Sequence, residues 1–186
     1  MSKEDNTMPT LFELLNERLD KKMTPEMTYV ITKHRVLVVD HIGGCRYNAL
    51  ATPNGRIYVT DELTRRLSPT QMEAVIQHEK GHVAHKDGIV RIALSWGLLL
   101  GTIYVTHRAP KGLKTRVYVY CNIITMLLTM IHSWTGEFRA DRNAYNKLAL
   151  CSALIEINKL NNISDSTITK THPSLNMRMR MLKKFC

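Results

Sequence analysis

This 186-residue sequence has a strong helix start ten residues before the first of two histidines. Ser68-Pro69-Thr70-Gln71 supplies a hydroxyl N-cap, a proline at the first helical position and a glutamine that completes a capping box. Apolar residues then recur at helical spacing, at Met72, Val75, Ile76 and Val83. Lys86-Asp87-Gly88 is a stop signal, so we expect the helix to end at about His85. The helix is amphipathic, and its apolar side is predicted to face the core.

His78, Glu79 and His82 lie on this helix in the pattern H-E-x-x-H. Histidines four residues apart project from one face about one turn apart, so both imidazoles can reach one metal ion. Glu79 lies beside that ion but is angled away from it, where it can take a proton from zinc-bound water. The pattern also occurs by chance in helices that bind nothing, but the capped amphipathic helix and an acid downstream favour a metal site.

A third ligand is expected from another element of the fold. Glu137-Phe138-Arg139-Ala140-Asp141 carries two carboxylates four residues apart, which face the same way on a predicted helix. Glu137 is the candidate ligand, and Asp141 can accept a hydrogen bond from a ligand histidine and fix its ring. The alternative interpretation is a surface helix whose acid pair faces Arg139 and Arg142.

His85 competes for the third position because it shares nearly the same helix face as His78 and His82. It lies about 10 Å from His78 along the axis, at 1.5 Å per residue, which makes three tetrahedral ligands from one straight helix difficult. We therefore place His85 at the rim of the site or behind the ligands.

Short extended segments precede this helix, and further helices follow it. Residues 36–39 are β-branched and predict a strand, while residues 48–52 and 56–60 predict a hairpin around Pro53-Asn54-Gly55. Further helices are expected over residues 89–106, 117–134, 136–160 and 173–184. The predicted fold is α+β and mainly helical, with a small N-terminal β-hairpin or sheet packed on the helix that carries the histidines.

Length and composition indicate an ordinary globular protein. The length predicts a single domain over residues 1–186, with residues 1–30 as a helical N-terminal extension. Leucines at helical spacing occur in residues 1–20 without the apolar run of a secretory signal, so we expect the chain to begin in the cytoplasm. The four cysteines form no C-x-x-C pair, which fits a reducing compartment.

The formal net charge of +10 raises nucleic acid and anionic membranes as partners. The basic residues are concentrated only at residues 108–116 and 178–184, and neither segment resembles a nucleic-acid-binding motif. We therefore do not expect direct nucleic-acid binding.

Five blocks occur in a fixed order between residues 46 and 182. They are Asn48-Ala49, Gly55-Arg56-Ile57-Tyr58-Val59-Thr60, Gln77-His78-Glu79-Lys80-Gly81-His82-Val83, Glu137-Phe138-Arg139-Ala140-Asp141, and His172-Pro173-Ser174 with Arg178. In this order the sequence resembles the HtpX-like and CAAX prenyl endopeptidase group of gluzincin metallopeptidases. The ordered set is far more specific than any one block.

The resemblance implies a gluzincin fold in which residues 31–186 form the catalytic region. It implies one Zn²⁺ per chain, held by His78, His82 and Glu137. Glu79 is then the general base, and Asp141 supports a ligand histidine.

The resemblance also implies how a substrate binds. Asn48 and the strand at residues 56–60 would form a rim along which an extended polypeptide binds through backbone hydrogen bonds. His172 or Arg178 is the candidate group for stabilising an oxyanion, although a histidine before a proline fits a turn equally well.

Membrane attachment is the point at which the sequence departs from the family. HtpX-like proteins carry a pair of N-terminal membrane-spanning helices that this sequence does not show. Residues 92–106 are uncharged but short for a bilayer, whereas residues 117–136 are long enough to span one. The loop between them carries Arg108, Lys111, Lys114 and Arg116. Moving that loop across a membrane opposes the positive-inside rule, so we expect buried or membrane-surface helices in a cytoplasmic protein.

Three functions follow from these residues. The leading hypothesis is a zinc-dependent endopeptidase that acts on extended or unfolded polypeptides through a metal-activated water. The alternative is a catalytically inactive, metal-stabilised binding or adaptor protein of the same fold. A third class is a basic nucleic-acid or membrane-surface protein in which the histidine pattern is accidental.

Overall fold

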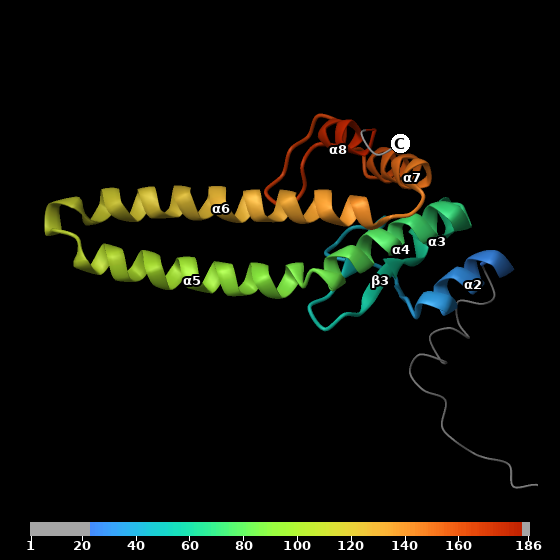
Figure 1. Ribbon diagram of the computed structural model, residues 1–186, viewed down its shortest axis with the longest axis horizontal. Helices are drawn as coiled ribbons and strands as arrows, with labels where there is room; N and C mark the ends of the chain where they lie inside the picture. The colour runs from blue at the N-terminus through green and yellow to red at the C-terminus, as the bar shows by residue number, and fades with distance from the viewer. Residues whose placement is uncertain (1–22, 184–186) are drawn as a thin grey trace, which may run out of the picture.

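The chain folds into a body and a long helical hairpin that projects from it (Figure 1). The computed structural model describes residues 23–183, and the helix predicted over residues 1–20 lies outside them. The body holds a three-stranded sheet together with short and medium helices, and the hairpin consists of two long helices. The predicted mainly helical α+β fold is confirmed.

The helix with the two histidines, α4 (Pro69–Ala84), crosses the centre of the body. It begins at the Ser68 N-cap, and the predicted capping box between Ser68 and Gln71 is present. Its buried apolar side chains are those of Met72, Ala74, Val75 and Ile76, and Val83 is half-buried. The amphipathic helix expected from the sequence is therefore formed, with its apolar side in the core.

The sheet consists of β1 (Leu37–Val39), β2 (Ala49–Ala51) and β3 (Ile57–Thr60) in the order β1-β3-β2. β2 and β3 form the predicted antiparallel hairpin, and β1 pairs with β3 in parallel. Val59 in the central strand is fully buried, and β2 and β3 both contact α4. One edge of β2 is left unpaired within the described sheet.

Two further helices complete the N-terminal side of the body. α2 (Pro25–His34) is capped by Thr24, ends at Arg35 in the left-handed region with φ of 52°, and packs on α4. α3 (Asp61–Arg66) follows β3 directly and was not predicted, because its six residues have no side-chain cap hydrogen bond and are too few for a clear period. Its Leu63 is fully buried.

The hairpin is built from α5 (Asp87–Arg108) and α6 (Lys114–Asn143), joined by the short 3₁₀ helix η1 (Lys111–Leu113). The two helices lie side by side and extend well beyond the body (Figure 1). Both are long and apolar enough to cross a membrane, with 6% and 0% of their most apolar windows buried. Of the two expected alternatives, buried or membrane-surface helices, the first is therefore wrong, because the helices project away from the core.

One predicted boundary is also wrong. The break expected near residue 135 does not exist, because α6 continues through Gly136, where an added Cβ would lie 3.0 Å from Oδ2 of Asp87. The break comes at Ala144 instead, where Asn146 caps the next helix by accepting a hydrogen bond from the Ala149 N–H.

Two C-terminal helices pack back onto the body beside α4 and α6. They are α7 (Lys147–Leu160) and α8 (Leu175–Leu182), and α8 contacts both α6 and α7. Residues 161–174, which we call the strap, run between them past the base of the hairpin, where the indole N–H of Trp134 donates to the Thr169 carbonyl at 3.0 Å. The strap brings His172 to the same end of α6 as Glu137.

Candidate metal centre

The site is built where α4 crosses α6. A Cβ at Gly81 would lie 2.8 Å from the Ala140 Cα, a distance that real contacts do not reach. The two helices approach this closely because Gly81 has no side chain and Ala140 has a small one. The close crossing sets the two histidines of α4 against the two carboxylates of α6.

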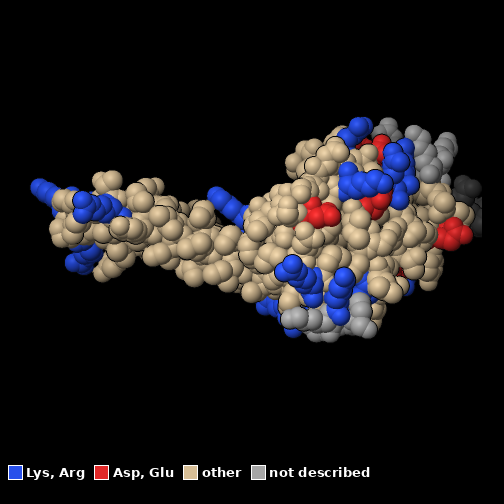
Figure 2. All heavy atoms as spheres, turned by 90° about the horizontal axis from the view of Figure 1, so that it is seen from above, with Lys and Arg blue, Asp and Glu red and all other residues tan. Residues whose placement is uncertain are grey.

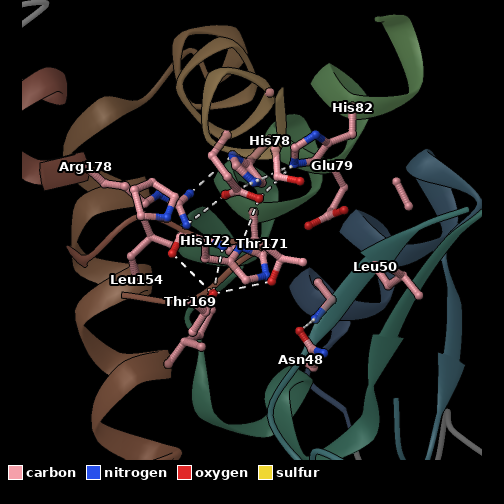
Figure 3. Close-up of a pocket in the computed structure, with 18 of the residues that line it drawn as sticks. Asn48, Leu50, His78, Glu79, His82, Leu154, Thr169, Thr171, His172 and Arg178 are labelled. Atoms are coloured by element: carbon pink, nitrogen blue, oxygen red, sulfur yellow. Dashed lines mark hydrogen bonds and ion pairs between the residues drawn. The ribbon is translucent and has the colours of Figure 1, made fainter. Parts of the chain in front are cut away.

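Three side chains converge at this crossing, namely His78, His82 and Glu137. Figure 3 labels the two histidines, which point towards each other. Each of the three side chains offers a ligand atom, and these atoms all lie within 4.8 Å of one another. The two Nε2 atoms are 3.2 Å apart, and they lie 3.6 Å and 3.5 Å from the carboxylate oxygens of Glu137. Two imidazoles and one carboxylate form the donor set of a catalytic zinc site.

The donor atoms also have unmet bonding capacity. Oε2 of Glu137 is buried and accepts no hydrogen bond among the described residues, although the Arg178 guanidinium lies 3.1 Å away. The facing Nε2 atoms of His78 and His82 can share only one proton between them. A cation between the three groups would satisfy all of them, so the residues present fit a metal ion.

A carboxylate lies behind each histidine. Asp141 lies 3.0 Å from the Nδ1 of His78 and is paired with the buried guanidinium of Arg178. Asp87 lies 2.8 Å from the Nδ1 of His82. Such partners hold the ring and leave the opposite nitrogen free for a metal.

Sequence analysis missed Asp87 and interpreted it only as part of a helix stop. The available signal was its place five residues after His82, immediately beyond the end of α4. A carboxylate at that point can turn back towards the last histidine of the helix.

The charges of the site are strongly coupled. Burial acts to raise the pKa of the Glu137 carboxyl, but Arg178, His172 and His82 hold that pKa well below its ordinary value. Burial acts likewise on Asp141, and Arg178 and His78 lower the pKa of that carboxyl. Both carboxylates are therefore anionic at neutral pH.

The carboxylates in turn raise the pKa values of the basic groups beside them. Burial would lower the pKa of His82, but Glu137 raises it to about 9. The pKa of Arg178 is also raised against the effect of burial, by Asp141 and Glu137. Proton and metal ion thus compete for the same nitrogen of His82, and Arg178 stays cationic.

Glu79 is buried, with 8% of its surface exposed, and lines a cleft of about 530 Å³. The cleft runs between β2 on one side and α7 with the strap on the other (Figure 3). Asn48 lies on its rim, where its own Oδ1 accepts a hydrogen bond from the Ala49 N–H at 2.9 Å.

The remaining predicted residues lie at different depths. His172 is 60% exposed, and its Nδ1 lies 2.9 Å from a Glu137 oxygen. Arg178 is buried between the Asp141 and Glu137 carboxylates. His85 is exposed at the end of α4 and is neither part of the converging group nor a lining residue of the cleft.

Fold and site together define a candidate metal centre with a carboxylic acid beside it in a cleft, the arrangement that zinc peptidases use. The chain belongs to peptidase family M48, whose sequence profile matches residues 8–185. The resemblance to HtpX-like proteins is confirmed by this match and by the relatives below.

Two curated relatives are proteases by name. Protease HtpX homolog 1 of Streptomyces coelicolor is 43% identical over 61 residues, which cover 30% of this chain and 20% of that protein. Protease HtpX homolog of Helicobacter pylori is 24% identical over 168 residues, which cover 70% of this chain and 54% of that protein. The chain thus spans about half the length, or less, of the relatives it matches. No solved structure matches the chain.

Proposed function

We propose that this protein is a zinc-dependent endopeptidase in which His78, His82 and Glu137 hold one Zn²⁺. The observation that carries the proposal is the convergence of their three ligand atoms within 4.8 Å at the inner end of the cleft. When bound, zinc polarises the carbonyl group that is attacked and lowers the pKa of a water molecule to about 7.

Glu79 is the proposed general base. It directly follows the ligand His78 and lines the same cleft. Its carboxylate accepts the proton of the attacking water and then delivers it to the nitrogen of the leaving amine. Burial from bulk water favours this transfer, because the proton is then exchanged only within the cleft.

The proposed substrate is an extended or unfolded polypeptide that lies along β2. The Asn48 carbonyl accepts from the Thr60 N–H and the Thr52 N–H donates to the Arg56 carbonyl, so these residues face β3. In an antiparallel pair the alternate residues direct their backbone groups to the other side, which here is the outer edge at Ala49 and Ala51. At this edge the Ala49 N–H already donates to Oδ1 of Asn48, so the Ala49 carbonyl and both backbone groups of Ala51 are the groups offered to a peptide. An extended peptide can pair with that edge as an additional strand.

His172 is the better candidate of the two for stabilising the oxyanion. Its imidazole is exposed on the strap and reaches the Glu137 carboxylate from the open side of the site. Arg178 is enclosed by carboxylates, so its charge offsets Glu137 and Asp141 rather than a substrate. Asp141 then fixes the ring of His78.

We also propose that the part of the α5–α6 hairpin beyond the body inserts into a membrane. A helix of 22 residues is about 33 Å long, close to the roughly 30 Å of a hydrocarbon core. Figure 2 shows the hairpin as a mostly uncharged surface with lysines and arginines gathered at its end. Exposed tyrosines lie near that end, namely Tyr104, Tyr118 and Tyr120, and Trp134 lies at the base.

Aromatic residues at both ends of an apolar span are typical of membrane interfaces. The basic tip led the sequence analysis to favour buried or surface helices. Basic residues of this kind, however, bear on which way a hairpin is oriented in a membrane. The exposed apolar side chains of the hairpin bear on what surrounds it. A contiguous apolar surface of this kind indicates a lipid or protein environment. We therefore expect the protein to resist extraction from membranes by carbonate and by high salt.

The test of the proposed activity is zinc content together with casein hydrolysis, measured on the wild type, Glu79→Gln and Glu26→Gln. Glu26 is an exposed acid on α2 and serves as the matched control. We expect stoichiometric zinc in all three proteins and a loss of about 10²- to 10⁴-fold in hydrolysis for Glu79→Gln alone. Zinc without hydrolysis in the wild type would favour the adaptor alternative, and no zinc at all would mean an accidental motif.

A further inference from the structure

We infer that Asp87 is a positioning residue that holds the His82 ring in place and thereby couples the base of the hairpin to the metal centre. The inference rests on the proposed zinc site. It adds Asp87 to that site and makes zinc affinity depend on the base of the hairpin. Asp87 is the first residue of α5, so it belongs to the hairpin and not to α4, the helix that carries the two histidines.

The contact with His82 has the geometry that a metal ligand needs. Oδ2 of Asp87 lies 2.8 Å from Nδ1 of His82, and Nε2 of the same ring faces His78 and Glu137. A neutral imidazole that binds metal through Nε2 carries its hydrogen on Nδ1 and donates it to this carboxylate. Asp87 therefore selects the tautomer and the ring orientation that leave Nε2 free.

The second helix of the hairpin holds Asp87 in turn. Nη2 of Arg139 donates to Oδ1 of Asp87 at 2.6 Å. A Cβ at Gly136 would lie 3.0 Å from Oδ2, so the absence of a side chain there leaves room for the carboxylate. Gly136 and Arg139 lie on either side of Glu137 along α6, so the helix that supplies the third ligand also positions Asp87.

Behind each of the two histidines thus lies a carboxylate that is itself paired with an arginine, and the two pairs lie in different parts of the molecule. Behind His78, Asp141 contacts the ring and pairs with Arg178, whose side chain is buried and only 9% exposed. Behind His82, Asp87 contacts the ring and pairs with Arg139, whose side chain is 37% exposed. The first support lies within the body, and the second lies at the base of the hairpin.

A consequence is that zinc affinity depends on how α5 packs against α6 at its first turn. The connection from α4 is tight, because Lys86 alone, in the left-handed region with φ of 55°, separates His85 from Asp87. Coupling is reciprocal, so zinc must stabilise the first turn of α5 by the same factor by which that turn stabilises zinc. Zinc should therefore slow hydrogen exchange over residues 86–92.

The experiment is a zinc titration of the full chain in detergent, against a chromophoric chelator, for Asp87→Ala, Asp87→Asn and Asp61→Ala. Asp61 is the matched control, because it is also the first residue of a helix and pairs with an arginine, Arg65. We expect Asp87→Ala to weaken binding by about 10- to 100-fold and Asp61→Ala to leave it unchanged. Asp87→Asn should weaken it less, because an amide oxygen still accepts a hydrogen bond from Nδ1.

Two further readouts separate positioning from loss of fold. The Co²⁺-substituted Asp87→Ala protein should show a changed visible absorption spectrum, while the metal-free variant melts near the wild type. Zinc should slow exchange over residues 86–92 in the wild type and not in Asp87→Ala.

The inference fails alone if the wild type binds zinc and Asp87→Ala binds it as tightly as Asp61→Ala does. It also fails if Asp87→Asn is no better than Asp87→Ala. A wild type that binds no zinc would instead overturn the proposed function itself, and with it this inference.

Discussion

The two ends of α6 show opposite arrangements of charge and apolar surface within one continuous helix. In its last eight residues four are buried, and two of those, Glu137 and Asp141, are acids. In residues 114–135 none is buried, and the exposed side chains include Ile123, Ile124 and Ile131. Helical structure alone therefore does not decide what is buried, because the surroundings of each end do.

The physical reason differs between the two ends. At the body, buried acids are stabilised by Arg178 and by the histidines, since an unpaired buried charge is costly. Along the hairpin, apolar side chains are exposed, which is unfavourable in water and favourable in a hydrocarbon core. The first end therefore suits the proposed metal ion, and the second suits the proposed insertion into lipid.

The largest expected effect separates the ends by metal binding. Glu137→Ala should weaken zinc binding by more than the roughly 10- to 100-fold typical for loss of a group behind a ligand, because it removes a ligand itself. His78→Ala and His82→Ala should behave alike. Ile124→Ala, on the outer part of the same helix, should leave the affinity unchanged. Zinc titration of these variants measures the difference.

His85→Ala sharpens the same comparison within α4. His85 is exposed beyond the converging group, so its removal should change zinc affinity little. An order of variants in which His85→Ala is the weakest binder would overturn the ligand assignment.

The next effect concerns the hairpin. Leu100 is 61% exposed near the middle of α5, where an arginine would cost about 2.5–3.5 kcal/mol in a membrane. Leu100→Arg should therefore lower the fraction of protein that remains in carbonate-washed membranes. Leu148→Arg is the control, because Leu148 is 73% exposed on α7 of the body. Equal retention of the two variants would argue against insertion of the hairpin.

A smaller effect compares two glycines. Gly81→Ala forces a Cβ against Ala140 and should lower the free energy of unfolding by about 1–3 kcal/mol, as overpacking does. Gly97→Ala on α5 meets nothing within 4 Å, so it should be neutral or slightly stabilising. Thermal unfolding of both variants in detergent measures the contrast. A destabilised Gly97→Ala would mean that this face of α5 is packed.

Sequence reasoning succeeded where the signal is local. The Ser68 cap and the spacing of the two histidines predict α4 because each depends on residues within one or two turns. The acid pair at Glu137 and Asp141 was predicted by its helical spacing together with the histidine pattern upstream. These signals need no knowledge of the neighbouring elements.

The parts that were missed depend on tertiary contacts. Asp87 acts through His82 and Arg139, and the latter is 52 residues away in the chain. A helix boundary was expected between residues 134 and 136, whereas α6 continues through Gly136, beside which the Asp87 side chain lies. The exposure of the hairpin is a property of the whole fold, because the same apolar periodicity would fit a buried helix.

The smallest expected effect lies at the surface of the body, where charges are paired but reached by solvent. Glu73 on α4 lies 3.0 Å from the Lys33 Nζ and 2.8 Å from the His34 Nε2 on α2. Slight burial acts to raise the pKa of this carboxyl, but His34 and Lys33 lower it below its ordinary value of 4.5. A carboxyl whose pKa is lowered by folding adds stability above pH 4.5, and that stability is lost as the pH falls through the lowered pKa of the folded state.

Glu73→Gln should therefore destabilise the protein by less than about 1 kcal/mol at pH 7, because the pair is screened by water. The difference in melting temperature between wild type and Glu73→Gln should shrink as the pH is lowered below 4.5. Glu26→Gln, which alters an exposed acid on the same helix pair, should show no such trend. A difference that grows towards acidic pH would mean that Glu73 is destabilised by folding. The two ion pairs would then be no support for the packing of α2 on α4, in contrast to the buried pairs around Arg178.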